Sequence, residues 1–169
     1  HVAVRRQRQM CIRDRIITSM TTDTHMSYSI LNLSNVYGPR QDPHGEAGVV
    51  SIFSNKILNN EKPIIYGDGK QTRDYIYVKD VVSALILSSK IESNLFLNIG
   101  TGIETSVNHL LETIKSEFAS DIDPIYQESR KGELLRSVLN SSKAQKELNW
   151  ESQFSLNKGI KEVVSWLTT

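Results

Sequence analysis

Short apolar runs alternate with longer amphipathic segments along most of this chain, and this alternation constrains the fold more than any other feature. Leu95–Ile99 is a compact apolar run that ends at Gly100-Thr-Gly102, which is typical of a strand entering a turn. The next segment, 107–118, carries apolar residues at helical spacing. Strands that are separated by helices are joined by crossovers and not by hairpins. The pattern therefore predicts an α/β fold.

The same patterns predict most of the remaining elements. The expected strands are 27–34, 62–66, 74–78 and 95–99, with further short extended pieces at 122–127 and 134–139. The expected helices are 49–58, a segment that begins near Asp80, 106–118, 142–150 and 155–167. Small polar residues precede three of these helices and are predicted as N-caps, namely Thr105, Ser142 and Ser155.

Composition excludes several classes of protein. The hydrophobic share of 38% over 169 residues is ordinary for one globular domain. No apolar run approaches the roughly 20 residues of a membrane helix, and no apolar signal-peptide core follows the N-terminus. Cys11 is the only cysteine, which excludes an internal disulfide and fits a reducing compartment. A cytoplasmic location without a membrane partner is therefore predicted.

The first fifteen residues differ from the rest of the chain. They hold five of the 20 basic residues and one of the 19 acidic residues, so the remainder carries three more acids than bases. A nucleic-acid-binding body is expected to be basic, so no nucleic-acid partner is predicted. Residues 1–15 show neither sustained periodicity nor a helix cap, and either a basic arm or a non-native or mistranslated leader fits them. We expect the leader, followed by one functional unit over 16–169.

Two motifs identify a resemblance. Asn35-Val-Tyr-Gly-Pro-Arg-Gln-Asp-Pro43 is followed by Ile64-Ile-Tyr-Gly-Asp-Gly-Lys-Gln-Thr-Arg-Asp-Tyr-Ile-Tyr-Val-Lys-Asp80. Together they resemble the substrate-binding half of NAD-dependent nucleotide-sugar epimerases and dehydratases, in the extended short-chain dehydrogenase/reductase family. The resemblance covers about residues 27–168 and is strongest to UDP-glucose 4-epimerase-type enzymes. It implies a C-terminal substrate-binding lobe with the last strands of a truncated Rossmann-type parallel sheet.

The resemblance implies a set of substrate-binding residues. Arg73 and Arg130 would bind the pyrophosphate of a nucleotide-sugar, a role that suits the planar guanidinium, and Glu133 would accept from hydroxyls of the nucleoside. A surface ion pair of Arg73 with Asp68 or Asp74, and a solvated charged turn at 130–133, are the structural alternatives.

Other implied contacts come from uncharged residues. Asn35 would hydrogen-bond a phosphate, with a turn-stabilising role as its alternative. The family's uracil-binding wall corresponds to Gly48, Val49, Ile64 and Tyr66. Ser34 falls where relatives contact the nicotinamide end of NAD.

The residues of catalysis are not found. No Gly-x-Gly-x-x-Gly opens a helix, and the positions of the family's catalytic tyrosine and lysine fall near Arg6 and Met10. Tyr75 and Lys79 have the right spacing, but Tyr75 belongs to an expected strand. The histidines lack metal-ligand spacing, and no Gly-x-Ser-x-Gly occurs. We therefore expect no catalytic or metal-binding residues here.

The resemblance leaves several functions open. NAD would be held only by the intact parent enzyme, which is expected to be a homodimer, and this chain alone is expected to be inactive. A non-catalytic nucleotide-sugar binding module is one alternative. A parent of the dTDP-glucose dehydratase or UDP-glucuronate decarboxylase type is another.

Overall fold

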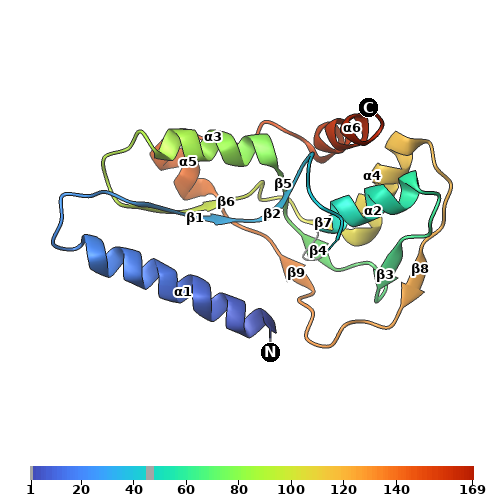
Figure 1. The fold of residues 1–169 in the computed structure, drawn as a ribbon, viewed down its shortest axis with the longest axis horizontal. Coiled ribbons are helices and arrows are strands. Elements are labelled where there is room, and N and C mark those ends of the chain that lie inside the picture. The colour runs from blue at the N-terminus through green and yellow to red at the C-terminus, as the bar shows by residue number, and fades with distance from the viewer. Residues whose placement is uncertain (1, 45–47) are drawn as a thin grey trace.

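The computed structural model describes residues 2–44 and 48–169, with side chains from residue 12 onward, and it is an α/β fold (Figure 1). The helices are α1 (Val2–Thr21), α2 (Val49–Leu58), α3 (Val78–Ser88), α4 (Val107–Phe118), α5 (Ser142–Leu148) and α6 (Leu156–Leu167). The strands are β1 (Ser29–Leu33), β2 (Asn35–Tyr37), β3 (Ile64–Tyr66), β4 (Thr72–Arg73), β5 (Tyr75–Tyr77), β6 (Leu95–Ile99), β7 (Thr105–Ser106), β8 (Ile125–Gln127) and β9 (Arg136–Ser137).

The strands pair across long stretches of sequence. β1 pairs with β6, β2 with β5 and β3 with β8, all in parallel. β4 lies between β7, which is antiparallel to it, and β9, which is parallel. No two consecutive strands pair within the described residues, so the expected crossover connections are confirmed.

Two hydrophobic clusters hold the fold together. The first packs α2, α4 and α6 against one another and against β5, with Phe53, Leu110 and Ile160 almost fully buried. The second lies where α3 and α5 cover one face of β1 and β6, around Leu97 and Trp150 (Figure 1). Each large side chain buried in these clusters contributes roughly 1.5–3 kcal/mol.

Two predicted helix caps are shifted by one residue. Ser106, not Thr105, caps α4, and its hydroxyl accepts a hydrogen bond from the backbone of His109 at 3.1 Å. Thr105 instead lies in β7 and is buried. Ser141 precedes α5 without a side-chain cap bond, and Ser142 is the first helical residue. Ser155 caps α6 as predicted, accepting from the backbone of Lys158.

The N-terminal segment is helical, which the sequence pattern did not predict. α1 extends over 2–21, although its first turn has no acidic residue to complement the helix dipole. Ile12, Ile16 and Met20 are each more than half exposed. α1 lies on the side of β1 and β6 opposite to α3 and α5 (Figure 1). In the part of α1 whose side chains are described, from residue 12 onward, the large apolar residues are therefore exposed although the backbone is helical.

No helix among the described residues is long and apolar enough to cross a membrane.

Candidate functional site

A cavity of about 510 Å³ lies between α2, β3 and the chain that leads through β4 into β5, and the loop after β8 closes it. Its lining consists of Asn35, Gly48, Val49, Ile52, Phe53, Lys56, Ile64, Ile65, Tyr66, Gln71, Arg73, Tyr75, Val107, Arg130 and Glu133. All eight residues that the sequence predicted as substrate-binding are among them. They come from five separate segments of the chain, which only the tertiary structure brings together.

Ser34 is the one predicted site residue outside this cavity. It follows β1 directly, where its backbone N–H donates to Ile99 at 2.9 Å. Its hydroxyl is buried and has no hydrogen-bond partner among the described residues. A Cβ on Gly100 would approach the Cβ of Ser34 to 3.2 Å, so the serine packs on the turn that follows β6.

Arg73 is held at the cavity by groups distant in sequence. Its guanidinium pairs with Glu133 at 3.3 Å and donates to the carbonyl of Leu134 at 2.8 Å. The side chain is only 20% exposed. The predicted alternative, an ion pair with Asp68 or Asp74, is wrong because Glu133 is the partner. Arg73 and Glu133 are thus fixed beside each other in the cavity wall.

Arg130 is placed differently, against an aromatic ring. The centre of its guanidinium lies 3.9 Å from the centroid of the Tyr66 ring, which is a cation–π contact. Arg130 has no ion-pair partner among the described residues. Its charge is therefore available to an anionic group in the cavity.

Two glycines near the cavity have little room for a side chain, one in its lining and one in the turn between β3 and β4. Gly69 has a φ of 71°, and a Cβ there would collide with the side chain of Asn108, so the turn from β3 to β4 requires glycine. A Cβ on Gly48 would lie 2.9 Å from the amide nitrogen of Gln41. The missing side chain at Gly48 thus lets Gln41 pack against the start of α2.

Asn35 stands at the start of β2, beside Tyr75 of β5. Its side-chain amide donates to the backbone carbonyl of Asp74 at 3.2 Å. The predicted alternative was a local turn-stabilising role, but the bond crosses to the neighbouring strand. Asn35 also lines the same cavity as Gly48 and Val49.

Several lining residues were not predicted. Lys56 of α2 adds a further cation, although it pairs with Glu61 at 2.6 Å. Gln71 donates from its amide to the carbonyl of Tyr66 at 2.9 Å. Tyr75 is nearly fully buried at the cavity wall. Gln71 and Tyr75 lie inside the motif around Arg73, so their position in that motif could have predicted them as lining residues.

The structure shows no catalytic pair of the Tyr-x-x-x-Lys type in the part that it describes. Tyr75 belongs to β5 and Lys79 to α3, where its ammonium pairs with Glu162 at 3.4 Å. Tyr66 and Lys70 share the same spacing but flank the glycine turn after β3. No group of three or more His, Cys, Asp or Glu side chains that could hold a metal ion occurs among the described residues.

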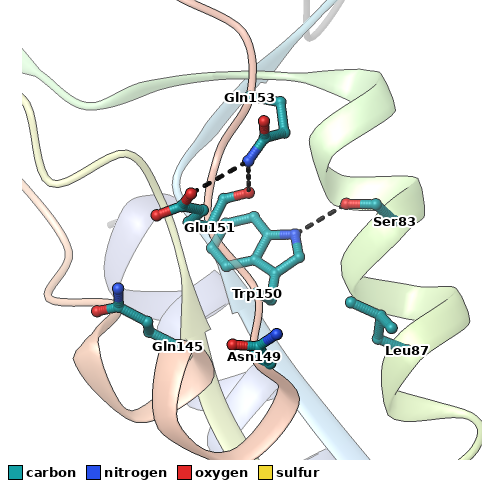
Figure 2. Close-up of a pocket in the computed structure, with 7 residues that line it drawn as sticks. All are labelled: Ser83, Leu87, Gln145, Asn149, Trp150, Glu151 and Gln153. Atoms are coloured by element: carbon teal, nitrogen blue, oxygen red, sulfur yellow. Dashed lines mark hydrogen bonds between the residues drawn. The ribbon is translucent and has the colours of Figure 1, made fainter.

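A second hollow, of about 370 Å³, lies between α3 and the segment from α5 to α6 (Figure 2). The indole of Trp150 donates to the Ser83 hydroxyl at 2.8 Å, and the Gln153 amide lies 3.4 Å from the Glu151 carbonyl. These polar groups bond to one another, and the hollow has no basic side chain. We therefore interpret this hollow as a structural contact between α3 and the segment from α5 to α6.

The family model described as GDP-mannose 4,6 dehydratase matches residues 11–163. The chain belongs to the NAD-dependent epimerase/dehydratase family. A Methanocaldococcus jannaschii protein that carries a provisional UDP-glucose 4-epimerase name is 49% identical over 142 residues, which cover 84% of this chain and 46% of that protein.

Two solved structures of this family share the fold. UDP-glucose 4-epimerase of Thermotoga maritima with UDP-glucose is 42% identical, with a TM-score of 0.88, over 91% of this chain and 50% of that chain. UDP-glucose 4-epimerase of Thermus thermophilus with NAD is 31% identical, with a TM-score of 0.81, over 92% and 51%. The chain thus spans about half the length of the family members that it matches.

Proposed function

We propose that this chain supplies the nucleotide-diphosphate pocket of an NAD-dependent nucleotide-sugar 4-epimerase of the UDP-glucose type. The observation that carries the proposal is the meeting of eight motif residues in one cavity. The similarity to UDP-glucose 4-epimerases, one of them with UDP-glucose, supports the choice of ligand.

The charges of the cavity favour a diphosphate. Arg73, Arg130 and Lys56 contribute three positive charges, and Glu133 contributes one negative charge. Arg73 already donates to backbone carbonyls and to Glu133, so its position is set before a ligand arrives. Hydrogen bonds from guanidinium groups to phosphate are among the strongest that side chains make.

The apolar part of the cavity lining suits a flat base. Ile64 and Val49 present aliphatic surface, and Tyr66 presents an aromatic ring that Arg130 covers. In the proposed complex a uracil ring stacks on Tyr66 in place of the Arg130 guanidinium, and that guanidinium moves to a phosphate. In this proposal Glu133 accepts from a hydroxyl of the ribose, Asn35 bonds a phosphate, and Ser34 contacts NAD in the whole enzyme. The homodimeric state and cytoplasmic location of that enzyme remain predictions from the sequence.

The proposal is tested by titrating the 169-residue chain with UDP in a calorimeter. We expect saturable binding, and we expect Arg73→Ala and Arg130→Ala each to weaken it. A charge-assisted hydrogen bond is worth about 1.5–3 kcal/mol, which corresponds to a loss of tenfold or more. Lys161→Ala is the matched control, since it removes one cation from the exposed face of α6.

Circular dichroism would establish that each variant retains the fold of the unmodified chain. If the folded chain bound no UDP, the proposal would be refuted. Equal losses in Arg73→Ala, Arg130→Ala and Lys161→Ala would refute the pocket assignment and leave only a general charge effect.

A further inference from the structure

Asn108, the second residue of α4, joins two segments that lead into the candidate site. Its side-chain amide donates to the backbone carbonyl of Asp68 at 2.9 Å, in the glycine turn after β3. Its amide oxygen accepts from the hydroxyl of Tyr126, on β8, at 3.3 Å. Asn108 itself lies outside the lining of the cavity. The side chain is therefore a bridge between the glycine turn and β8.

The first turn of α4 is also anchored on the glycine turn through its backbone. The first N–H groups of a helix have no partner within the helix. Here the N–H of Asn108 donates to the carbonyl of Gly69 at 3.0 Å, and that of Val107 donates to the carbonyl of Gln71 at 3.2 Å. Glycine at position 69 permits this approach, since a Cβ there would collide with the Asn108 side chain. The helix thus fixes the segment that runs from the turn toward Arg73.

Both bridged segments carry side chains of the cavity. The turn follows Tyr66 and precedes Arg73, and β8 precedes Arg130. β8 lies beside β3 (Figure 1), and the N–H of Gly67 donates to the carbonyl of Gln127 at 2.9 Å. A shift of the turn relative to β8 would therefore change the spacing between the two arginines.

The bridge requires the chemistry of an amide. One group must donate to a carbonyl while another accepts from a hydroxyl, and an asparagine side chain offers both. An aspartate of the same shape would keep the acceptor but turn a second oxygen toward the carbonyl of Asp68. An alanine would remove both hydrogen bonds.

We propose that Asn108 is a positioning residue of the candidate site, which holds the glycine turn and β8 at the spacing that the ligand needs. This inference rests on the proposed function, because the spacing matters only if Arg73 and Arg130 act on one ligand. Asn108 acts through these residues and does not touch the ligand itself.

Ser106 provides a matched control in the same turn of α4. Its hydroxyl caps the helix by accepting from the backbone of His109 at 3.1 Å. Loss of an N-cap lowers stability. Within the described residues the Ser106 side chain makes no hydrogen bond to the glycine turn or to β8. Ser106→Ala therefore reports the effect of a weaker α4 alone, whereas Asn108→Ala also breaks the bridge.

The experiment measures UDP affinity by calorimetry, at a temperature at which circular dichroism shows each variant to be folded. We expect Asn108→Ala to weaken UDP binding about fivefold or more, and Tyr126→Phe about threefold, since each hydrogen bond is worth a few-fold in an equilibrium. The double variant should be no weaker than Asn108→Ala, because both changes break one bridge. Ser106→Ala should bind UDP within about twofold of the unmodified chain although its thermal midpoint is lower.

The possible failures are distinguishable. If the unmodified chain binds UDP and Asn108→Ala binds it equally well, only this inference is overturned. A loss in Ser106→Ala equal to that in Asn108→Ala would also overturn it, because the stability of α4 would then be the cause.

Losses that add in the double variant would show that the two side chains do not form one bridge, and would overturn the inference. Tyr126 is 55% exposed, so Tyr126→Phe tests the bridge even if Asn108→Ala does not fold. If the folded unmodified chain binds no UDP, both the proposed function and the inference fall.

Discussion

At the scale of single residues, Asp74 shows how one buried carboxylate positions the site. It lies between Arg73 and Tyr75, is fully buried, and accepts from two backbone N–H groups of the turn after β6 and one before α5. Its backbone also bonds Asn35 and Ser137, each at 2.9 Å. A buried carboxylate is tolerated when donors satisfy it, and here those donors fix the segment that carries two cavity residues.

We expect Asp74→Asn to destabilise the chain by about 3 kcal/mol, because the amide would place N–H groups against donors that the carboxylate accepted. Urea unfolding followed by circular dichroism would measure this change. Asp121→Asn, at an exposed position after α4, is the control and should leave the midpoint unchanged. A midpoint of Asp74→Asn equal to that of the control would contradict the role assigned to Asp74.

At the scale of elements, one ion pair supports the small sheet of β7, β4 and β9. Glu104 stands just before β7 and accepts from Arg136 of β9 at 2.9 Å and from Thr72 of β4 at 2.7 Å. The hydrogen bond from Arg136, together with that from Thr72, lowers the pKa of Glu104 to about 2. A single acid thus links three strands that are far apart in sequence.

The sign of the resulting pH dependence follows from linkage. A lowered carboxyl pKa stabilises the folded state above the unfolded-state pKa, about 4.3, and this stability is lost as the pH falls toward 2. We therefore expect Arg136→Gln to be less stable than the unmodified chain at pH 6, with a gap that narrows by pH 2.5. Urea midpoints at several pH values would measure the gap. Lys161→Gln is the control for net charge, and a gap independent of pH would refute the prediction.

At the scale of the whole molecule, the predicted substrate-binding residues line one cavity, while the catalytic motifs of the family are not found in the sequence. The cavity residues come from helices and strands that the two hydrophobic clusters hold together. No glycine fingerprint for a dinucleotide occurs in the 169 residues. We therefore expect this chain to bind the substrate and not to carry out the redox chemistry.

We expect the purified chain to show no NAD-dependent epimerase turnover with UDP-glucose and no binding of NAD. Turnover would be followed by chromatography of the sugar nucleotides, and NAD binding by calorimetry. A full-length UDP-glucose 4-epimerase from a related organism is the positive control. Measurable turnover by the chain alone would show that it carries catalytic residues that the motifs do not reveal.

The sequence alone predicted the types of most elements and eight of the residues that line the cavity. β6 coincides with the predicted strand 95–99, and α2, α4 and α6 match predicted helices to within one residue at each end. They match because periodicity indicates which face of a local segment is buried. The family resemblance, carried by the motifs that begin at Asn35 and Ile64, led to the eight predicted residues that line the cavity. Local pattern failed at α1, whose large apolar side chains are exposed from residue 12 onward, where the structure describes them. It also failed at the cap of α4, where Ser106 and Thr105 are chemically equivalent candidates.

Only the tertiary structure decided which distant groups meet. It paired Arg73 with Glu133 and not with Asp68 or Asp74, and it placed Ser34 outside the cavity. It also placed the Tyr75 hydroxyl where none of the described residues offers it a hydrogen bond. Spacing along a chain describes neighbours within a few residues. Contacts such as β1 with β6 join residues more than sixty positions apart, and they are set by which surfaces can be buried together.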